Sequence, residues 1–322
     1  MSMPAYETPP EFHHLTVLKR EAVDALSPKN GGVYVDLTLG AGGHTEAILE
    51  RAPGARVIAF DRDPSAIIYA RGRLERFQSR ITFVQSRFSE LSEQLARLGV
   101  EHVDGLLADL GVSSPQLDQA ARGMSFRREG PLDMRMDPTE GETAADLLVR
   151  LTQDELADVI YHLGEERRSR RVARCIKQAL DAGELETTFD LRRAIVRAVG
   201  PRRVGGIDPA TRTFQALRLA VNRELEELTL LLKQCADVVS PGGVAAFISF
   251  HSLEDRLVKR AFLDKGAWQR LTKKPIVATL EEQAENPRSR SAKLRAAFRR
   301  GAPEEFDASL EFDAEEEDSG SY

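Results

Sequence analysis

A glycine turn and an acidic residue stand where a nucleotide-like ligand could bind. Residues 33–45 (VYVDLTLGAGGHT) run from an apolar stretch into Gly42 and Gly43, and a second apolar stretch at 57–60 ends in Asp61. This order is typical of a βαβ unit whose acid accepts hydrogen bonds from ribose hydroxyls. Glycines let a ligand lie against bare backbone, since a Cβ would fill its space. The sequence therefore predicts a site for a nucleotide-like ligand.

The acids near this turn favour a positively charged ligand over a dinucleotide. A dinucleotide motif needs a third glycine, and Thr45 occupies that position. Asp36 and Asp109 end the first and fourth apolar stretches, where a pyrophosphate would be repelled. S-adenosylmethionine carries a sulfonium and an ammonium and suits these acids, with Asp61 on its ribose. Asp36 could instead only cap the turn, a role that Asp often fills.

The elements that must position these residues alternate in the first third of the chain. Apolar β-branched stretches alternate with helical patterns, which predicts a parallel, doubly wound sheet that binds ligands beyond the carboxyl ends of its strands. The expected strands are 33–39, 56–60, 81–84 and 103–108, and the expected helices are 45–51, 64–77 and 88–98.

The alternation stops between about 118 and 208, where only helices are expected. Thr152 and Glu155 form a capping box, and a basic helix at 166–182 ends near Gly183. The α/β pattern then returns. We expect a long helix from Phe214 to about Val239, a strand at 244–250, a helix capped by Ser252, and a last strand within 292–298.

Composition indicates a globular protein with a mildly basic body. The chain has 322 residues, of which 42% are hydrophobic, and a net charge of −6. Residues 303–322 hold nine acids, and without them 45 basic residues face 42 acidic ones, a net charge of +3. We expect this tail to be disordered. Basic residues cluster at 167–177, 192–203 and 288–300, which favours a polyanionic partner, although such runs are more often solvated helix faces.

The sequence gives little support for a membrane protein, a secreted disulfide-bonded protein or a metalloprotein. No apolar stretch approaches the ~20 residues of a membrane span, and the first twenty residues lack a signal-peptide core. The two cysteines, Cys175 and Cys235, lie in helical patterns, and the six histidines have no ligand spacing. We therefore expect a cytoplasmic protein with no metal site and no membrane association.

Several long sequence motifs make the chain similar to a known family. It closely resembles the bacterial ribosomal RNA small-subunit methyltransferase H family (RsmH, also called MraW) from about residue 12 to 300. The motifs that carry the resemblance are 108–118 (ADLGVSSPQLD), 122–126 (RGMSF), 131–137 (PLDMRMD), 161–167 (YHLGEER), 208–216 (DPATRTFQA), 249–256 (SFHSLEDR) and 286–292 (NPRSRSA).

The resemblance implies a fold, an activity and a set of site residues. The fold is α/β, a Rossmann-like S-adenosylmethionine-dependent methyltransferase sheet (1–117 and 209–302) with an all-helical insertion (118–208). The activity is methylation of the exocyclic N4 of a cytosine in 16S ribosomal RNA, in the decoding centre near the P site. The partner is then 16S rRNA or the small ribosomal subunit, and a monomer and a homodimer both stay open. The implied donor-binding residues are Gly42, Gly43, His44, Asp61, Phe88, Asp109 and Gln116.

Chemistry at this amine needs an acceptor for one N–H, because the nitrogen lone pair is delocalised into the ring. Asp109 is the catalytic candidate, and a role in donor binding alone is equally compatible with the sequence. His251 follows the fifth strand and either contacts substrate or bonds to nearby backbone. The helices carrying 167–177 could form the wall of a cleft that holds RNA phosphates.

Two other functions are weighed against this one. A methyltransferase acting on DNA or a small amine is disfavoured, since residues 109–116 do not resemble the motif that DNA amino-methyltransferases place after the fourth strand. An RNA-binding ribosome assembly factor that only retains the fold is disfavoured by the intact Gly42, Gly43, Asp61 and Asp109.

Overall fold

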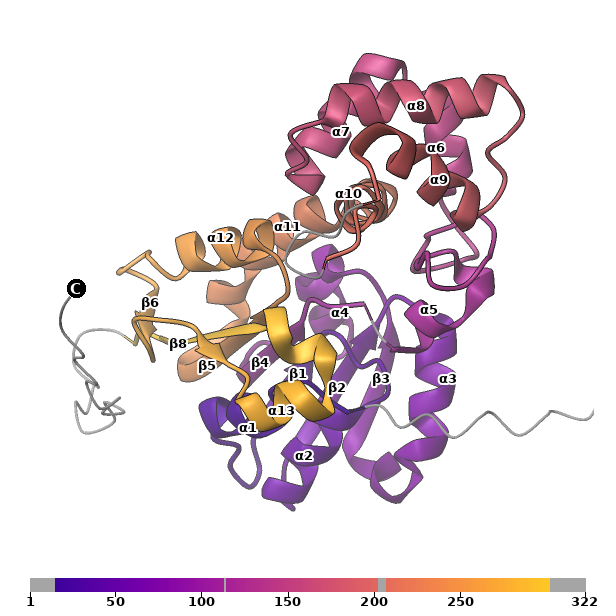
Figure 1. Cartoon of the computed structure of the whole chain (residues 1–322). Coiled ribbons are helices and arrows are strands. Elements are labelled where there is room, and N and C mark those ends of the chain that lie inside the picture. The colour runs from indigo at the N-terminus through magenta and orange to yellow at the C-terminus, as the bar shows by residue number, and fades with distance from the viewer. Residues whose placement is uncertain (1–14, 113, 202–206, 302–322) are drawn as a thin grey trace, which may run out of the picture. The chain divides into compact units, whose positions relative to one another are not determined.

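The computed structural model describes residues 15–112, 114–201 and 207–301 (Figure 1). The acidic tail predicted to be disordered lies outside these residues. The chain divides into two compact units. The helical unit contains Val112–Leu225, and the sheet unit contains Thr16–Gly111 together with the chain from Glu226 onward.

The sheet unit is built on one mixed sheet, which confirms the predicted α/β fold. Its strand order is β3-β2-β1-β4-β5-β8-β6, with β7 also paired to β8. The pairs from β3 to β5 are parallel, and β8 runs antiparallel to β5, β6 and β7. The strands are β1 (Val33–Asp36), β2 (Arg56–Asp61), β3 (Ile81–Gln85), β4 (Val103–Asp109), β5 (Val239–Ser249), β6 (Trp268–Arg270), β7 (Ile276–Val277) and β8 (Lys293–Arg299).

Successive residues of each central strand enter cores on opposite faces of the sheet. Tyr34 belongs to one core and Val35 to the other, and the same alternation separates Leu107 from Leu106. Because both faces are covered, these strands have near-continuous apolar runs. The alternation thus explains why the strands were visible in the sequence.

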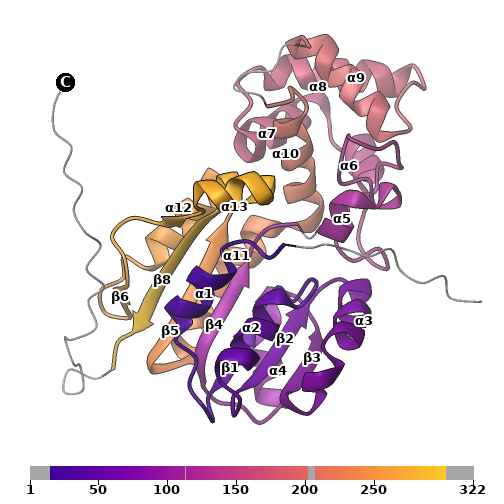
Figure 2. The ribbon, with the colours of Figure 1, turned by 60° about the horizontal axis from the view of Figure 1, so that its bottom comes forward.

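Helices cover both faces of this sheet. Figure 2 shows α1 and α2 on one face, where they share a core with α3. On the other face lie α4, α11 and α12. The helices of the unit are α1 (Lys19–Leu26), α2 (Gly43–Arg51), α3 (Pro64–Arg73), α4 (Leu91–Arg97), α11 (Glu224–Val238), α12 (Ser252–Ala261) and α13 (Leu280–Glu285).

The helical unit has its own core. Thr143, Thr152 and Thr187 each begin a helix with a complete capping box, so the box predicted at Thr152 is confirmed. The apolar faces of these helices pack together with that of α10. The helices are α5 (Ser114–Asp118), α6 (Ala144–Arg150), α7 (Gln153–Gly164), α8 (Ser169–Asp181), α9 (Thr188–Val199) and α10 (Thr211–Asn222).

The prediction of one long helix from Phe214 to about Val239 is wrong, because the structure has two helices there. Arg223, with a φ of +53°, separates α10 from α11. Phe214 and Leu217 of α10 are buried in the helical core, whereas Leu228 of α11 is buried against the sheet. The helical unit accordingly extends beyond the expected insertion, 118–208.

Candidate functional site

Three aspartates end neighbouring parallel strands at one edge of the sheet. Asp36 ends β1, Asp61 ends β2 and Asp109 ends β4. Asp36 is 1% exposed and accepts hydrogen bonds from the Thr45 hydroxyl at 2.7 Å and from the Thr38 amide at 3.1 Å. The Thr38 hydroxyl in turn accepts from the Asp109 amide at 2.6 Å. The predicted gathering of acids at the carboxyl edge is therefore present.

Asp61 is held in place by the backbone on both sides of it. One carboxylate oxygen accepts from the Gly40 amide at 2.8 Å, and the other accepts from the Asp63 amide at 2.8 Å. Each oxygen keeps a further lone pair, since a carboxylate oxygen accepts about two hydrogen bonds. Asp61 is thus fixed against the glycine turn and still able to accept from two neighbouring hydroxyls, as a ribose presents them.

The two glycines are needed for packing within the protein. A Cβ on Gly42 would lie 2.6 Å from Leu74 Cδ1, and its φ of +82° favours glycine. A Cβ on Gly43 would lie 1.8 Å from Thr16 Oγ1. The expectation that ligand space alone excludes a Cβ is therefore incomplete, because protein atoms occupy that space at both positions.

His44 is tied to the segment before α1. Its Nε2 lies 3.1 Å from the Val17 carbonyl oxygen, and its side chain is buried. Residues 16–18, here called the N-terminal strap, therefore contact two successive residues of the glycine turn. No local pattern predicts this strap, since its partners lie on a different element.

Burial raises the pKa of all three aspartates. The pKa of Asp36 rises to about 6, and those of Asp61 and Asp109 rise to about 7. The negative charges of Asp36 and Glu254 raise the pKa of Asp109 further. A cation beside these carboxyls would favour their ionised forms. The edge thus fits a ligand that combines a positive centre with hydroxyl groups.

Two further predicted donor residues occupy different units. Phe88 opens a short 3-10 helix (Phe88–Glu90) after β3 and packs partly buried against the sheet core. The structure thus brings Phe88 to the same edge as the aspartates. Gln116 belongs to the helical unit, where its side chain on α5 is buried. Its role toward the donor stays a prediction.

His251 caps α12, which corrects the expected cap at Ser252. The His251 Nδ1 accepts from the Glu254 amide at 3.4 Å, and its Nε2 lies 3.1 Å from the Glu254 carboxylate. Glu254 also accepts from the Phe250 amide at 2.9 Å. The Nδ1 contact fits the interpretation of His251 as a turn residue bonded to nearby backbone, whereas its buried Nε2 makes no hydrogen bond with the described residues, so the substrate interpretation stays open.

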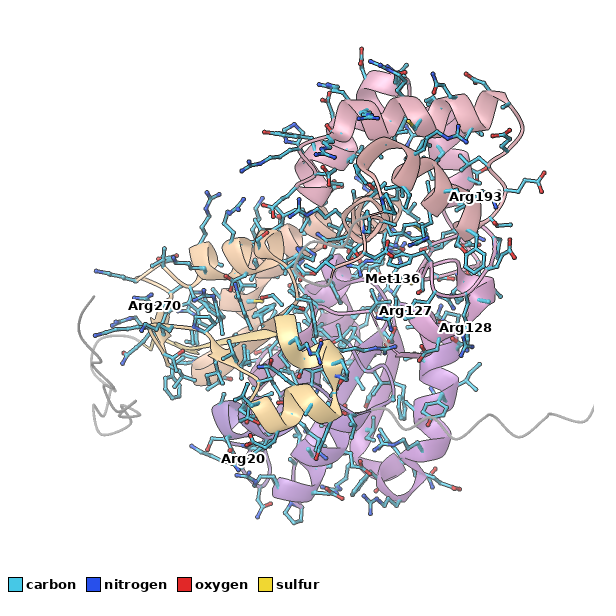
Figure 3. All side chains as sticks on the ribbon, viewed as in Figure 1. Arg20, Arg127, Arg128, Met136, Arg193 and Arg270 are labelled. Carbon is cyan, nitrogen blue, oxygen red and sulfur yellow. The ribbon has the colours of Figure 1, made fainter. Side chains whose placement is uncertain are left out.

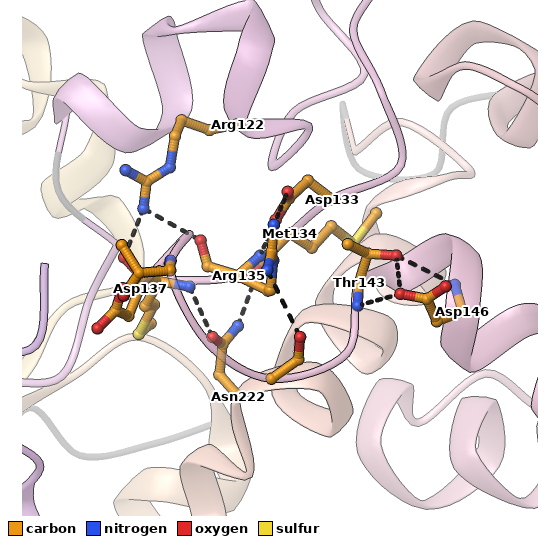
Figure 4. A network of polar contacts seen from close by, with 11 residues as sticks. Arg122, Asp133, Met134, Arg135, Asp137, Thr143, Asp146 and Asn222 are labelled. Carbon is orange, nitrogen blue, oxygen red and sulfur yellow. Dashed lines mark hydrogen bonds and ion pairs between the residues drawn. The ribbon is translucent and has the colours of Figure 1, made fainter.

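Residues 131–137 form a tightly bonded loop in the helical unit (Figure 4). The Asn222 side chain accepts from the Met136 amide at 2.7 Å and donates to the Met134 carbonyl at 2.8 Å. Arg122 donates to the Met136 carbonyl at 2.5 Å. These bonds hold Met134 buried in a left-handed conformation, with a φ of +62°. The loop is therefore rigidly joined to the end of α10.

Among the described residues, no cluster of three or more His, Cys, Asp or Glu side chains could hold a metal ion. No helix within the same residues is long and apolar enough to cross a membrane.

The doubly wound sheet, its glycine turn and the acids at its carboxyl edge fit the class of Rossmann-like, S-adenosylmethionine-dependent methyltransferases. The chain matches the MraW methylase family over residues 11–300 and belongs to that family. Ribosomal RNA small subunit methyltransferase H of Sorangium cellulosum is 65% identical over 90% of this chain and 92% of its own. The protein of that name from Bradyrhizobium diazoefficiens is 50% identical over 90% and 92%.

Solved structures resemble the chain at lower similarity. An rRNA methylase from Streptococcus thermophilus matches 87% of this chain and 95% of its own with a TM-score of 0.42 and 9% identity. The methyl donor of the present protein, as a methylase of the MraW family, is S-adenosylmethionine. The acidic edge and the lone pairs left on Asp61 fit this donor.

Proposed function

We propose that the protein methylates the exocyclic N4 of a cytosine in 16S ribosomal RNA, in the decoding centre near the P site, and acts in the cytoplasm. The names of the relatives, which are 50–65% identical, support small-subunit ribosomal RNA as the substrate. The sequence motifs that resemble the family occur in both units, and they support cytosine N4 as the atom that is methylated. The observation that most directly supports this activity is that Asp61 and Asp109 end neighbouring parallel strands at the same edge of the sheet.

In this proposal the donor is held by residues of the sheet unit, and Gln116 stays a predicted donor-binding residue of the helical unit. Gly42, Gly43 and His44 lie along the donor, Asp61 accepts from its ribose hydroxyls, and Phe88 flanks its adenine. When bound, S-adenosylmethionine supplies an electrophilic methyl group. The cytosine must reach it outside any base stack, because a stacked amine cannot approach a buried carbon.

Asp109 is the proposed catalytic residue. Its ionised carboxylate accepts an N–H of the cytosine amine, which shifts electron density back onto the nitrogen. The nitrogen forms a bond to the methyl carbon as the carbon–sulfur bond breaks. One amine proton then leaves to Asp109 and from there to water. With a pKa of about 7, Asp109 can both accept and release this proton near neutral pH.

Three arginines of the helical unit support RNA binding. Arg167, Arg171 and Arg174 are exposed, and within the described part of the chain their side chains have no ion pair or hydrogen bond. They follow one another at intervals of four and three residues, so Arg171 and Arg174 share one face of α8. By contrast, Arg193 on α9, labelled in Figure 3, pairs with Asp190. Unpaired guanidiniums are available for phosphates.

Replacing Arg171 and Arg174 together with alanine is expected to weaken RNA binding and its salt dependence. Each lost phosphate contact lowers the slope of log affinity against log salt by roughly 0.7–0.9. Filter binding of a 16S rRNA fragment between low and moderate salt measures both slopes. Arg193→Ala is the matched control, because its guanidinium is already paired. An unchanged slope in the double variant, or salt-independent binding by the wild type, contradicts this role.

The proposed function is tested in cells by mass spectrometry of 16S rRNA from a deletion strain. We expect the loss of one N4-methyl group on a cytosine. Wild-type protein should restore it, and Asp61→Ala protein should not. An unchanged modification pattern would refute the proposed activity. Defective subunit assembly with every methyl group retained would favour the assembly-factor alternative.

A further inference from the structure

Glu282 reaches from the C-terminal part of the sheet unit to the N-terminal strap. Its carboxylate accepts a hydrogen bond from the Leu18 amide at 2.7 Å, across 264 positions of sequence. The two preceding residues of the strap meet the glycine turn, where Val17 bonds to His44 and Thr16 packs on Gly43. Three consecutive residues therefore join Glu282 to the turn.

The carboxylate of Glu282 is diverted from its usual local role. Thr279 caps α13 and accepts from the Glu282 amide at 3.2 Å, which is half of a capping box. In a complete box the acid at this position bonds back to the amide of the cap residue. The three boxes of the helical unit are complete, whereas Glu282 gives its carboxylate to Leu18.

Leu18 needs this partner. Its side chain is fully buried, its φ is +49°, and it precedes α1 with no side-chain cap of its own. A left-handed conformation is unfavourable for leucine, so surrounding contacts must hold it. The Glu282 carboxylate supplies a charge-assisted bond at this strained residue. Without the bond, the strap loses one of the contacts that hold its backbone over Gly43 and His44.

We propose that Glu282 is a positioning residue for the methyl donor, acting through the strap on the glycine turn. The inference rests on the proposed function to the extent that Gly42, Gly43 and His44 bind the donor. Glu282 itself need not contact the donor or the RNA. Its removal should therefore change donor affinity and leave the chemical step intact.

The test compares Glu282→Ala with Glu282→Gln, which keeps an acceptor for the Leu18 amide. S-adenosylhomocysteine binding is measured by calorimetry on the full chain, and kcat and both KM values by methyl transfer to RNA. We expect Glu282→Ala to weaken donor binding by about five- to tenfold, less than the loss of a charge-assisted hydrogen bond made to the donor itself, because Glu282 acts only through the strap. Its kcat at saturating donor and its KM for RNA should stay within about twofold of wild type.

Matched controls lie on the same short helix. Glu281 and Glu285 are exposed and have no hydrogen bond or ion pair through their side chains within the described residues. Glu281→Ala, Glu285→Ala and Glu282→Gln should bind the donor within about twofold of wild type. Equal donor affinity of Glu282→Ala and Glu281→Ala overturns the proposal. A loss of kcat with unchanged donor affinity overturns it as well.

Hydrogen exchange of the ligand-free protein separates this inference from the proposed function. In Glu282→Ala, amides at the start of α2 should exchange faster than in wild type, while those of α4 on the other face should not. Unchanged exchange at α2 overturns the inference, whatever the turn binds. Faster exchange at α2 together with wild-type protein that binds no S-adenosylhomocysteine would instead refute the donor site.

Discussion

Replacing Asp109 with alanine is expected to lower kcat by about a hundredfold to ten-thousandfold at saturating methyl donor, the usual contribution of a positioned proton acceptor. The variant keeps the strand end but loses the carboxylate that would accept an N–H of the cytosine. Single-turnover methyl transfer to a 16S rRNA substrate measures the chemical step directly. Asp109→Asn is the matched control, because it keeps the size of the side chain while its amide cannot take up the proton.

The pH profile gives a second measure of the same residue. With a pKa of about 7, Asp109 is protonated below neutral pH and ionised above it. Because the bound cationic donor favours the ionised carboxyl, wild-type kcat at saturating donor should rise with pH over a range below this ligand-free pKa, and Asp109→Ala should lose this rise. Near-normal turnover of Asp109→Ala at saturating donor would leave Asp109 with no more than a role in donor binding.

Replacing Asp61 with alanine is expected to weaken donor binding by about a hundredfold, because two hydrogen bonds to a charged acceptor are lost at about 1.5 kcal/mol each. The two backbone amides at Gly40 and Asp63 also lose their shared partner. Calorimetry with S-adenosylhomocysteine measures the dissociation constant. The kcat at saturating donor should fall far less than in Asp109→Ala, since the proposed function puts Asp61 on the ribose and away from the reacting carbon.

Asp104→Ala is the matched control for Asp61→Ala. Asp104 also accepts from a backbone amide, that of Val33 at 2.7 Å, but it lies at the start of β4, at the opposite edge of the sheet. Its replacement should leave donor affinity within about twofold of wild type. If Asp61→Ala and Asp104→Ala bind S-adenosylhomocysteine equally well, Asp61 does not hold the donor.

Local patterns were enough to predict the acidic edge of the sheet. The strands ending in Asp36, Asp61 and Asp109 are short apolar runs, and parallel strands place their carboxyl ends together. The break at Arg223 could not be seen, because residues 214–239 contain neither glycine nor proline. There the buried surfaces of two cores decide where the helix ends, and no local signal records them.

Long-range contacts account for what the sequence hid at the site. The bond from Leu18 to Glu282 joins residues that no local pattern relates. The role of Gly43 was predicted from ligand space, although the Thr16 hydroxyl already excludes a side chain there. The capping role of His251 is a local contact, but it depends on the rotamer that turns its Nδ1 toward the Glu254 amide, and the sequence does not record that rotamer.

The pairing of β4 with β5 has a consequence for the order in which the protein folds. These strands join the two halves of the sheet, yet the chain leaves β4 and reaches β5 only after the whole helical unit. Closing so long a loop costs conformational entropy before any strand contact is gained. Hydrogen bonds between Asn222 and residues 134–136 join the end of the helical unit to its beginning. Once the helical unit has formed, the loop left to close between β4 and β5 is much shorter, so their pairing is expected to follow the folding of the helical unit.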